Sequence, residues 1–268
     1  MTWPFDTAPP VPLPPGRPVV GDEGAGTQPL LWISDGPAPA GLWAELHRAH
    51  PRSGLWPLLL SPLSAGDPDF RPWLSGELFP EHVSDFGSYD SAALLRTWWE
   101  AGSEEDEDEV GGDDGELAEV LAPYGRTWPG PAPAVTVPAG VADAEARGLA
   151  EVLASFKDVR LGLVPARSGA EALAACGWSG PLNHENDTAR IAAVLADWER
   201  RFGAQLVEVG FDTLHLSVPV PPATVAEALP LAAEHAAFCP DQVHQGAGTL
   251  TAYAEQLVDS HQWSFWWD

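Results

Sequence analysis

The sequence is poor in cysteine and in basic residues. Among 268 residues there are two cysteines, Cys176 and Cys239, and 13 basic residues, of which only Lys157 is lysine. Two cysteines in a chain of this length do not make a disulfide framework. Nucleic acids and anionic membrane surfaces bind proteins through clustered Lys and Arg. The composition therefore argues against a nucleic-acid partner and a membrane partner.

Long apolar runs and targeting signals are also missing. No run approaches the length that spans a bilayer, and "LWPLLL" is among the longest. Residues 1–16 are rich in proline and lack the basic and apolar regions of a secretory signal. With both thiols expected to stay reduced, the sequence predicts a cytoplasmic protein.

Acidic residues are abundant, and this sets the class of partner that we expect. The chain has 39 Asp and Glu and a formal net charge of −26. The electric field of a protein with this net charge attracts cations and basic proteins. Ten of the acids fall between Glu104 and Glu119, and this run predicts a flexible, solvated loop over residues 102–116. The loop does not fit the EF-hand template, because Val110 and Leu117 occupy ligand positions.

Aromatic residues are concentrated at the end of the sequence, which reads "HQWSFWWD" and is part of a total of 13 tryptophans. In a strand, Trp263, Phe265 and Trp267 would point to one face, and Trp266 to the other. An all-aromatic face is typical of a buried surface. We expect a C-terminal strand that closes the core, with Trp266 as a candidate for contact with a partner.

Composition divides the chain into four segments. Residues 1–28 form a Pro-rich extended leader, and residues 29–122 form an N-terminal region that begins with a β-α-β unit. Residues 123–140 carry five prolines and predict a linker. Residues 141–268 predict a C-terminal domain.

The C-terminal segment has the clearest local signals. Apolar residues recur at helical spacing over residues 188–203, and "QLVEVGFDTLHLSVPV" alternates as a hairpin does. "SGAE" at 168–171 and "TVAE" at 224–227 fit the capping box that starts a helix. Helices mixed with a hairpin predict an α+β fold, a mixed sheet with helices packed on it.

Candidate binding residues lie on irregular segments. The loop "GWSGPLNHEND" carries Trp178, Asn183, His184 and Glu185, and polar and aromatic side chains on a loop are typical of binding sites. The same composition is equally typical of a loop that covers its own core. His215 lies on the polar face of its hairpin arm and is a further candidate.

Catalytic and cofactor templates are missing, so no cofactor is expected. The chain lacks G-x-G-x-x-G, the Walker A loop, H-E-x-x-H and G-x-S-x-G. One group of metal-competent side chains, His235, Cys239, Asp241 and His244, has a spacing that matches no strong zinc pattern. A metal-assisted hydrolase that uses His235, Asp241 and His244 is the alternative function. A Cys–His nucleophile pair at Cys239 is a weaker alternative, because this cysteine follows a helix and lacks the N-terminal dipole that lowers a thiol pKa.

The stretches "RLGLVPARSGAEALAACGW", "WERRFGAQLVEVGFDTLHLSV" and "FCPDQVHQGAGTL…WSFWWD" resemble a bacterial family, domain of unknown function 4253, common in actinomycetes. The resemblance is most specific from Arg160 to Asp268 and implies no activity, cofactor or catalytic residue. We therefore expect a non-enzymatic module that binds a basic protein partner, such as an immunity-like protein that masks a basic toxin. The sequence indicates no oligomeric state.

Overall fold

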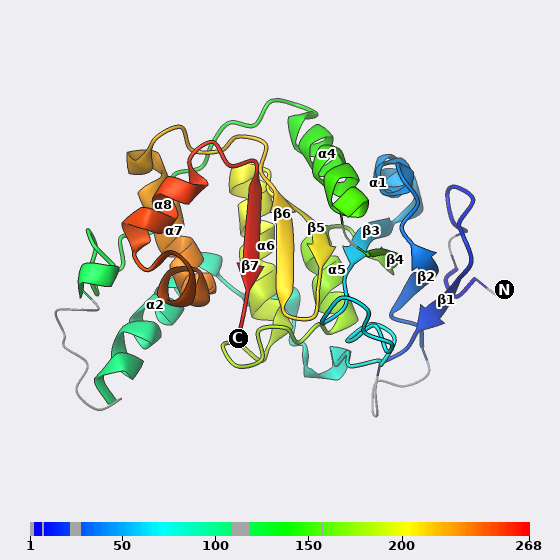
Figure 1. Ribbon diagram of the computed structural model, residues 1–268, viewed down its shortest axis with the longest axis horizontal. Helices are drawn as coiled ribbons and strands as arrows, with labels where there is room; N and C mark the ends of the chain where they lie inside the picture. Colours follow the sequence, from blue (N-terminus) through cyan, green and yellow to red (C-terminus); the bar gives the residue numbers. More distant parts are fainter. Residues whose placement is uncertain (1–2, 7, 22–27, 109–117, 157) are drawn as a thin grey trace.

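The computed structural model describes residues 3–6, 8–21, 28–108, 118–156 and 158–268 (Figure 1). A single seven-stranded sheet organises these residues, with the strand order β1-β2-β4-β3-β5-β6-β7. The strands are β1 (Gly16–Val19), β2 (Leu31–Pro37), β3 (Leu55–Leu60), β4 (Arg160–Pro165), β5 (Gln205–Val209), β6 (Thr213–Ser217) and β7 (Gln262–Trp266). The β3–β5 pair is parallel and the other pairs are antiparallel. The sheet is therefore mixed, as the α+β prediction requires.

Both halves of the chain contribute to this sheet. Strand β4 lies between β2 and β3 and pairs with each of them. The β-α-β unit expected after residue 28 is thus split by a strand from beyond the 123–140 segment. The expected leader also contains β1, which pairs with β2 at one edge of the sheet.

Helices cover the two faces of the sheet unequally (Figure 1). They are α1 (Leu42–Ser53), α2 (Ser91–Asp108), α4 (Val141–Phe156), α5 (Gly169–Cys176), α6 (Thr188–Phe202), α7 (Val225–Phe238) and α8 (Leu250–Leu257), with the short helices η1 (Pro80–His82), η2 (Phe86–Ser88) and η3 (Gln242–Ala247). Helices α1 and α4 share a core with one face, whereas α5, α6, α7 and α8 share the larger core on the other face. Helix α2 packs on α6 and α7. No helix among the described residues is long and apolar enough to cross a membrane.

The C-terminal strand closes the larger core, as predicted. Trp263, Phe265 and Trp267 are buried, whereas Ser264 on the opposite face is exposed. The ring of Phe265 stacks on Trp198 of α6 with centroids 5.4 Å apart, and Trp263 meets Trp198 edge-on at 5.5 Å. The aromatic residues at the end of the sequence therefore form interior packing rather than an exposed platform.

Local signals of the C-terminal segment are confirmed. The side chains of Ser168 and Thr224 accept hydrogen bonds from the backbone N–H groups of Glu171 and Glu227, so both capping boxes start helices. Strands β5 and β6 form the expected hairpin, and Gly203 ends α6 in the left-handed conformation.

The acidic segment differs from the expectation of a loop that starts at residue 102. Helix α2 extends to Asp108, so residues 102–108 are helical. Glutamate is a good helix former, and the helix is already started by the turns that bury Trp98 and Trp99. The rest of the expected loop, residues 109–116, lies outside the described residues.

Candidate functional site

The loop between α5 and α6 is anchored to the core at its first residues. Gly177 has a φ of 65°, and a Cβ there would lie 2.2 Å from the backbone nitrogen of Pro80. The following residue, Trp178, is fully buried, and its indole donates to the carbonyl oxygen of Gly210 at 2.9 Å. Trp178 is therefore a core residue, and its prediction as a binding residue is corrected. The loop covers its own core at this end.

Glu185 also faces inward rather than toward a partner. Its carboxylate accepts from the indole of Trp98 at 3.3 Å and from the backbone N–H of Asp187 at 3.0 Å. It forms an ion pair with Arg190 at 3.2 Å. Since the side chain is buried and paired, Glu185 holds the loop against α2 and α6.

Asn183 is exposed and His184 is half-buried, and both line a small cavity. Its volume is about 180 Å³, and its other lining residues are Pro240, Asp241, Trp267 and Asp268. We call this cavity the acidic pocket. It lies beyond the carboxyl end of β7, where the end of the chain is marked (Figure 1). Residues from three separate segments thus meet there, including Asp241 from the predicted metal-competent group.

Hydrogen bonds within the acidic pocket hold its walls together. The backbone N–H of Asp268 donates to Oδ2 of Asp241 at 3.1 Å, and the side-chain amide of Asn183 donates to the backbone oxygen of Asp268 at 3.1 Å. The indole of Trp267 donates to the carbonyl oxygen of Phe238 at 3.4 Å. These bonds connect the loop, the segment after α7 and the end of β7.

The electrostatics of the acidic pocket are one-sided. None of its six lining residues is Lys or Arg. Burial, reinforced by the nearby carboxylate of Asp268, raises the pKa of Asp212 above its ordinary value. Leu182, which precedes Asn183, leaves 62% of its surface exposed. The pocket therefore combines uncompensated negative charge with a neighbouring apolar side chain.

His215 and Trp266 lie elsewhere. Both side chains occupy the sheet face opposite Trp263 and Phe265, because they alternate with the inward-facing residues of β6 and β7. Nδ1 of His215 lies 2.8 Å from Nε2 of Gln262. Both residues are half-buried and neither lines the acidic pocket. The structure brings together Asn183 and His184, but not these two candidates.

The four metal-competent residues are also not brought together. His235 is fully buried among aromatic rings, its Nδ1 lies 3.0 Å from the Tyr253 hydroxyl, and burial lowers its pKa to about 3. Burial raises the pKa of Cys239 to about 12, and its thiol donates to the carbonyl oxygen of Trp266. Asp241 lines the acidic pocket and His244 is exposed. Within the described part of the chain, no three His, Cys, Asp or Glu side chains are placed to hold a metal ion.

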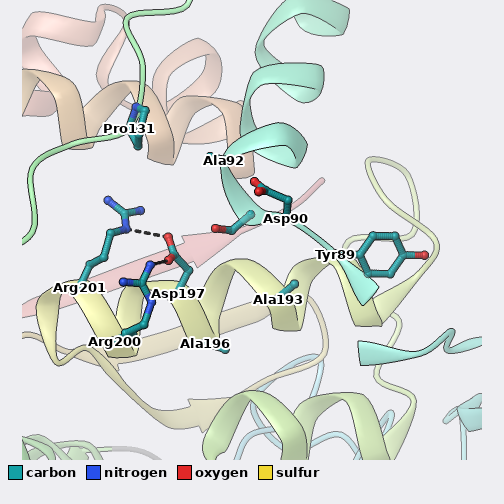
Figure 2. A pocket seen from close by; sticks show the side chains of 10 residues that line it. Tyr89, Asp90, Ala92, Pro131, Ala193, Ala196, Asp197, Arg200 and Arg201 are labelled. Carbon is teal, nitrogen blue, oxygen red and sulfur yellow. Dashed lines mark hydrogen bonds and ion pairs between the residues drawn. The ribbon is translucent and has the colours of Figure 1, made fainter. Parts of the chain in front are cut away.

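A larger cavity, of about 500 Å³, lies between the start of α2, α6 and the segment around Pro131 (Figure 2). Its floor is formed by small side chains of α6, Ala193 and Ala196. The carboxylate of Asp197 accepts from Arg200 and, at 2.6 Å, from Nε of Arg201. Acid and base therefore lie side by side in its wall.

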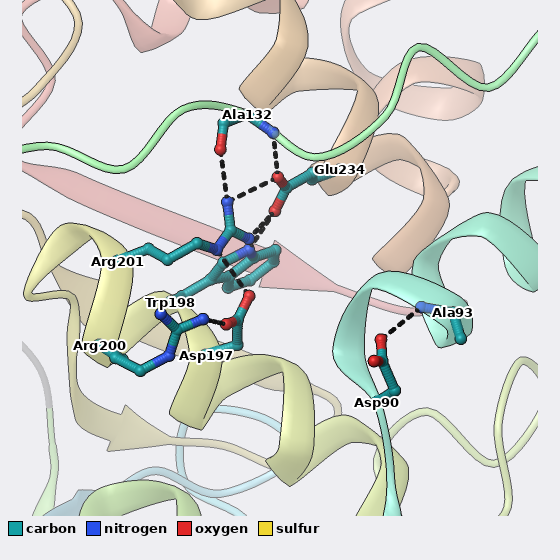
Figure 3. A network of polar contacts seen from close by, with 8 residues as sticks. All are labelled: Asp90, Ala93, Ala132, Asp197, Trp198, Arg200, Arg201 and Glu234. Carbon is teal, nitrogen blue, oxygen red and sulfur yellow. Dashed lines mark hydrogen bonds and ion pairs between the residues drawn. The ribbon is translucent and has the colours of Figure 1, made fainter.

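Behind this wall is a buried network that sequence reasoning missed (Figure 3). Glu234 of α7 is fully buried and accepts from Arg201 at 2.5 Å, from the Trp198 indole at 2.6 Å and from the backbone N–H of Ala132 at 2.6 Å. Arg201 also donates to the carbonyl oxygen of Ala132 at 2.9 Å. The segment expected as a linker is thus fastened to α6 and α7. The sequence did contain a signal for this network, because α6 and α7 each carry a charged residue, Arg201 and Glu234, within an otherwise apolar helix face.

The two cavities differ in how their charges are balanced. In the larger cavity Arg200 and Arg201 pair with Asp197, and Arg201 also pairs with Glu234, which lies behind the cavity wall. In the acidic pocket the carboxylate of Asp241 receives hydrogen bonds from two neutral donors, the side-chain amide of Gln245 and the backbone N–H of Asp268. Since uncompensated charge attracts a ligand of opposite charge, the acidic pocket is the better candidate site.

Comparison with known proteins gives one match. No curated protein and no solved structure matches the chain. Residues 160–268, which run from β4 through β7 and include every residue of the acidic pocket, match the family described as Domain of unknown function (DUF4253).

Proposed function

We propose that the chain is a non-enzymatic module that binds a basic protein through the acidic pocket. The observation that carries the proposal is the pocket itself: it places Asp241 and Asp268 beside each other with no lining cation, next to the exposed Leu182. Interfaces combine such an apolar contact with complementary charge. An immunity-like role, in which the chain masks a basic toxin, is one form of this function.

The rest of the molecule strengthens the negative field. Ion pairs within the chain engage seven arginines, Arg17, Arg71, Arg96, Arg167, Arg190, Arg200 and Arg201. Their charge is therefore already offset locally, while the chain keeps a net charge of −26. A field of this sign steers a cationic partner toward the protein and repels a second copy of the same chain.

We infer a bacterial, cytoplasmic setting for this function. The resemblance to an actinomycete family and the use of Arg rather than Lys, which is typical of a GC-rich genome, support a bacterial origin. Cys176 and Cys239 are both free and buried, and free thiols are the rule in reducing compartments.

Capture from the cell extract tests the proposal with a matched pair of baits. The wild-type chain should retain a basic protein that is released as salt is raised, because ionic strength screens the attraction. A bait carrying Asp241→Asn and Asp268→Asn should lose that protein while keeping its melting temperature. A captured set that is the same for both baits, or that resists salt, would contradict the proposal.

A further inference from the structure

The acidic pocket offers a ligand acceptors rather than donors. The amide of Asn183, the indole of Trp267 and the backbone N–H of Asp268 all donate to acceptors within the protein. Of the two aspartates, Asp241 accepts one hydrogen bond at each oxygen, from Gln245 and from Asp268. A carboxylate has about four lone-pair sites, so acceptor capacity is left over. The matching ligand group is rich in donors and positively charged.

The arrangement of the carboxylates distinguishes between the two basic side chains. The backbone N–H of Asp268 donates to Oδ2 of Asp241 at 3.1 Å, and both aspartates line the same small cavity. Two carboxylates that share one small cavity suit a planar fork with five N–H donors. A lysine ammonium is a compact charge that keeps its water more strongly.

The walls of the acidic pocket favour the same choice. Pro240, His184 and the largely buried Trp267 line it together with the acids. A guanidinium is weakly hydrated, so it sheds water beside such residues at lower cost than an ammonium. The volume of about 180 Å³ limits the occupant to one side chain rather than a folded element.

We propose that the acidic pocket receives the side chain of an arginine of the partner, in preference to a lysine. This inference rests on the proposed function and adds the residue that anchors the partner. The exposed Leu182 then lies where the chain that carries the arginine would contact the loop.

Fluorescence anisotropy with three labelled peptides tests the inference. The peptides share the sequence Gly-Ser-Leu-Xaa-Leu-Ser-Gly, with Xaa as arginine, lysine or citrulline, the neutral analogue of arginine. The arginine peptide should bind with a dissociation constant about tenfold lower than that of the lysine peptide. The citrulline peptide should bind more weakly than both, because it lacks the charge.

Variants of the chain locate the binding. Asp268→Asn should weaken arginine-peptide binding about fivefold or more, since it removes a side-chain carboxylate from the pocket. Asp241→Asn should act in the same direction. Glu151→Gln, which removes one charge from the exposed face of α4, is the matched control and should leave binding unchanged. Melting temperatures identify any variant that fails to fold.

The outcomes separate the inference from the proposed function. Equal affinity for arginine and lysine, with both lost in Asp268→Asn, overturns the arginine preference and leaves the proposed function standing. Arginine binding that survives both pocket variants overturns the assignment to this pocket. Binding of none of the peptides, together with a failed capture experiment, overturns both.

Discussion

At the scale of single residues, the larger core contains a buried ion pair between Glu234 and Arg201. Glu234 has no exposed surface, yet four hydrogen bonds from Ala132, Trp198 and Arg201 satisfy its carboxylate. Arg201 in turn donates to Asp197 and to Ala132. A buried pair of this kind adds little net stability compared with apolar residues, but breaking it leaves an uncompensated charge in the core.

Replacing one member of this pair should therefore be severe. We expect Glu234→Ala to lower the free energy of unfolding by about 3–5 kcal/mol, because Arg201 would stay buried without its partner. The double variant Arg201→Met with Glu234→Leu removes both charges and should lose much less. Urea unfolding measures both. If the double variant were as unstable as Glu234→Ala, the loss of the ion pair itself, rather than the unpaired charge, would account for the lower free energy of unfolding.

One carboxyl should make stability fall as the pH rises through the neutral range. Burial, reinforced by the negative charge of Asp143, raises the pKa of Glu199 from 4.5 to about 7. The folded state therefore holds this proton over a range in which the unfolded state has lost it. Its contribution is present below about pH 4.5 and declines until the pH passes about 7.

The matched comparison for Glu199 is Glu199→Gln. His47 and His235, whose pKa values are lowered by burial to about 4 and about 3, oppose the effect in the wild type, since they stabilise the fold as the pH rises toward 6.5. Subtracting the wild-type curve from that of the variant isolates Glu199. The difference in urea midpoint should grow in favour of the variant between pH 5 and pH 8. A constant difference would contradict the raised pKa.

At the scale of elements, the strands and helices that have a short-range sequence pattern were predictable. Which strands pair with one another in the sheet was not. The apolar spacing from Ile191 to Phe202 and the alternation around Phe211 depend on adjacent residues, so α6 and the β5–β6 hairpin follow from the sequence. The insertion of β4 between β2 and β3 depends on contacts between residues that are a hundred or more positions apart in the sequence. No local pattern carries that information.

The last strand gives the clearest test at this scale. Phe265→Ala should lower the free energy of unfolding by about 3–5 kcal/mol, because a fully buried ring that stacks on Trp198 is removed. Ser264→Ala, one position away on the exposed face, should change it by less than about 0.5 kcal/mol. Equal effects of the two substitutions would mean that the alternation of β7 does not decide its packing.

At the scale of the whole molecule, the acidic pocket is formed by segments that are distant in the sequence. Some of its residues could be predicted from local composition, but their meeting in one cavity could not. Asn183 and His184 were predicted from the composition of their loop, and Asp241 from its neighbourhood of His and Cys. Their meeting with Asp268 depends on how α7 and β7 are placed, and the inward turn of Trp178 depends on the approach of Gly210. The sequence therefore suggested Asn183, His184 and Asp241 separately, and their meeting in one cavity follows only from the fold.

The net charge of −26 should also make the folded state sensitive to salt. Repulsion among carboxylates opposes the compact state, and salt screens it. We expect the melting temperature to rise as sodium chloride is raised from near zero to about 0.3 M, where screening is nearly complete. Choline chloride is the control, and it should raise the melting temperature by the same amount as sodium chloride. A rise with sodium alone would point to specific cation binding instead of screening.

The most direct test of the proposed binding site is to map where the arginine peptide binds. Backbone amide resonances of the isotope-labelled chain would be followed during titration with the arginine peptide. We expect shifts concentrated at Asn183, His184, Asp241, Trp267 and Asp268, and we expect their loss in Asp268→Asn. Shifts concentrated around Asp90 and Asp197 in the larger cavity, or spread evenly over the acidic surface, would contradict it.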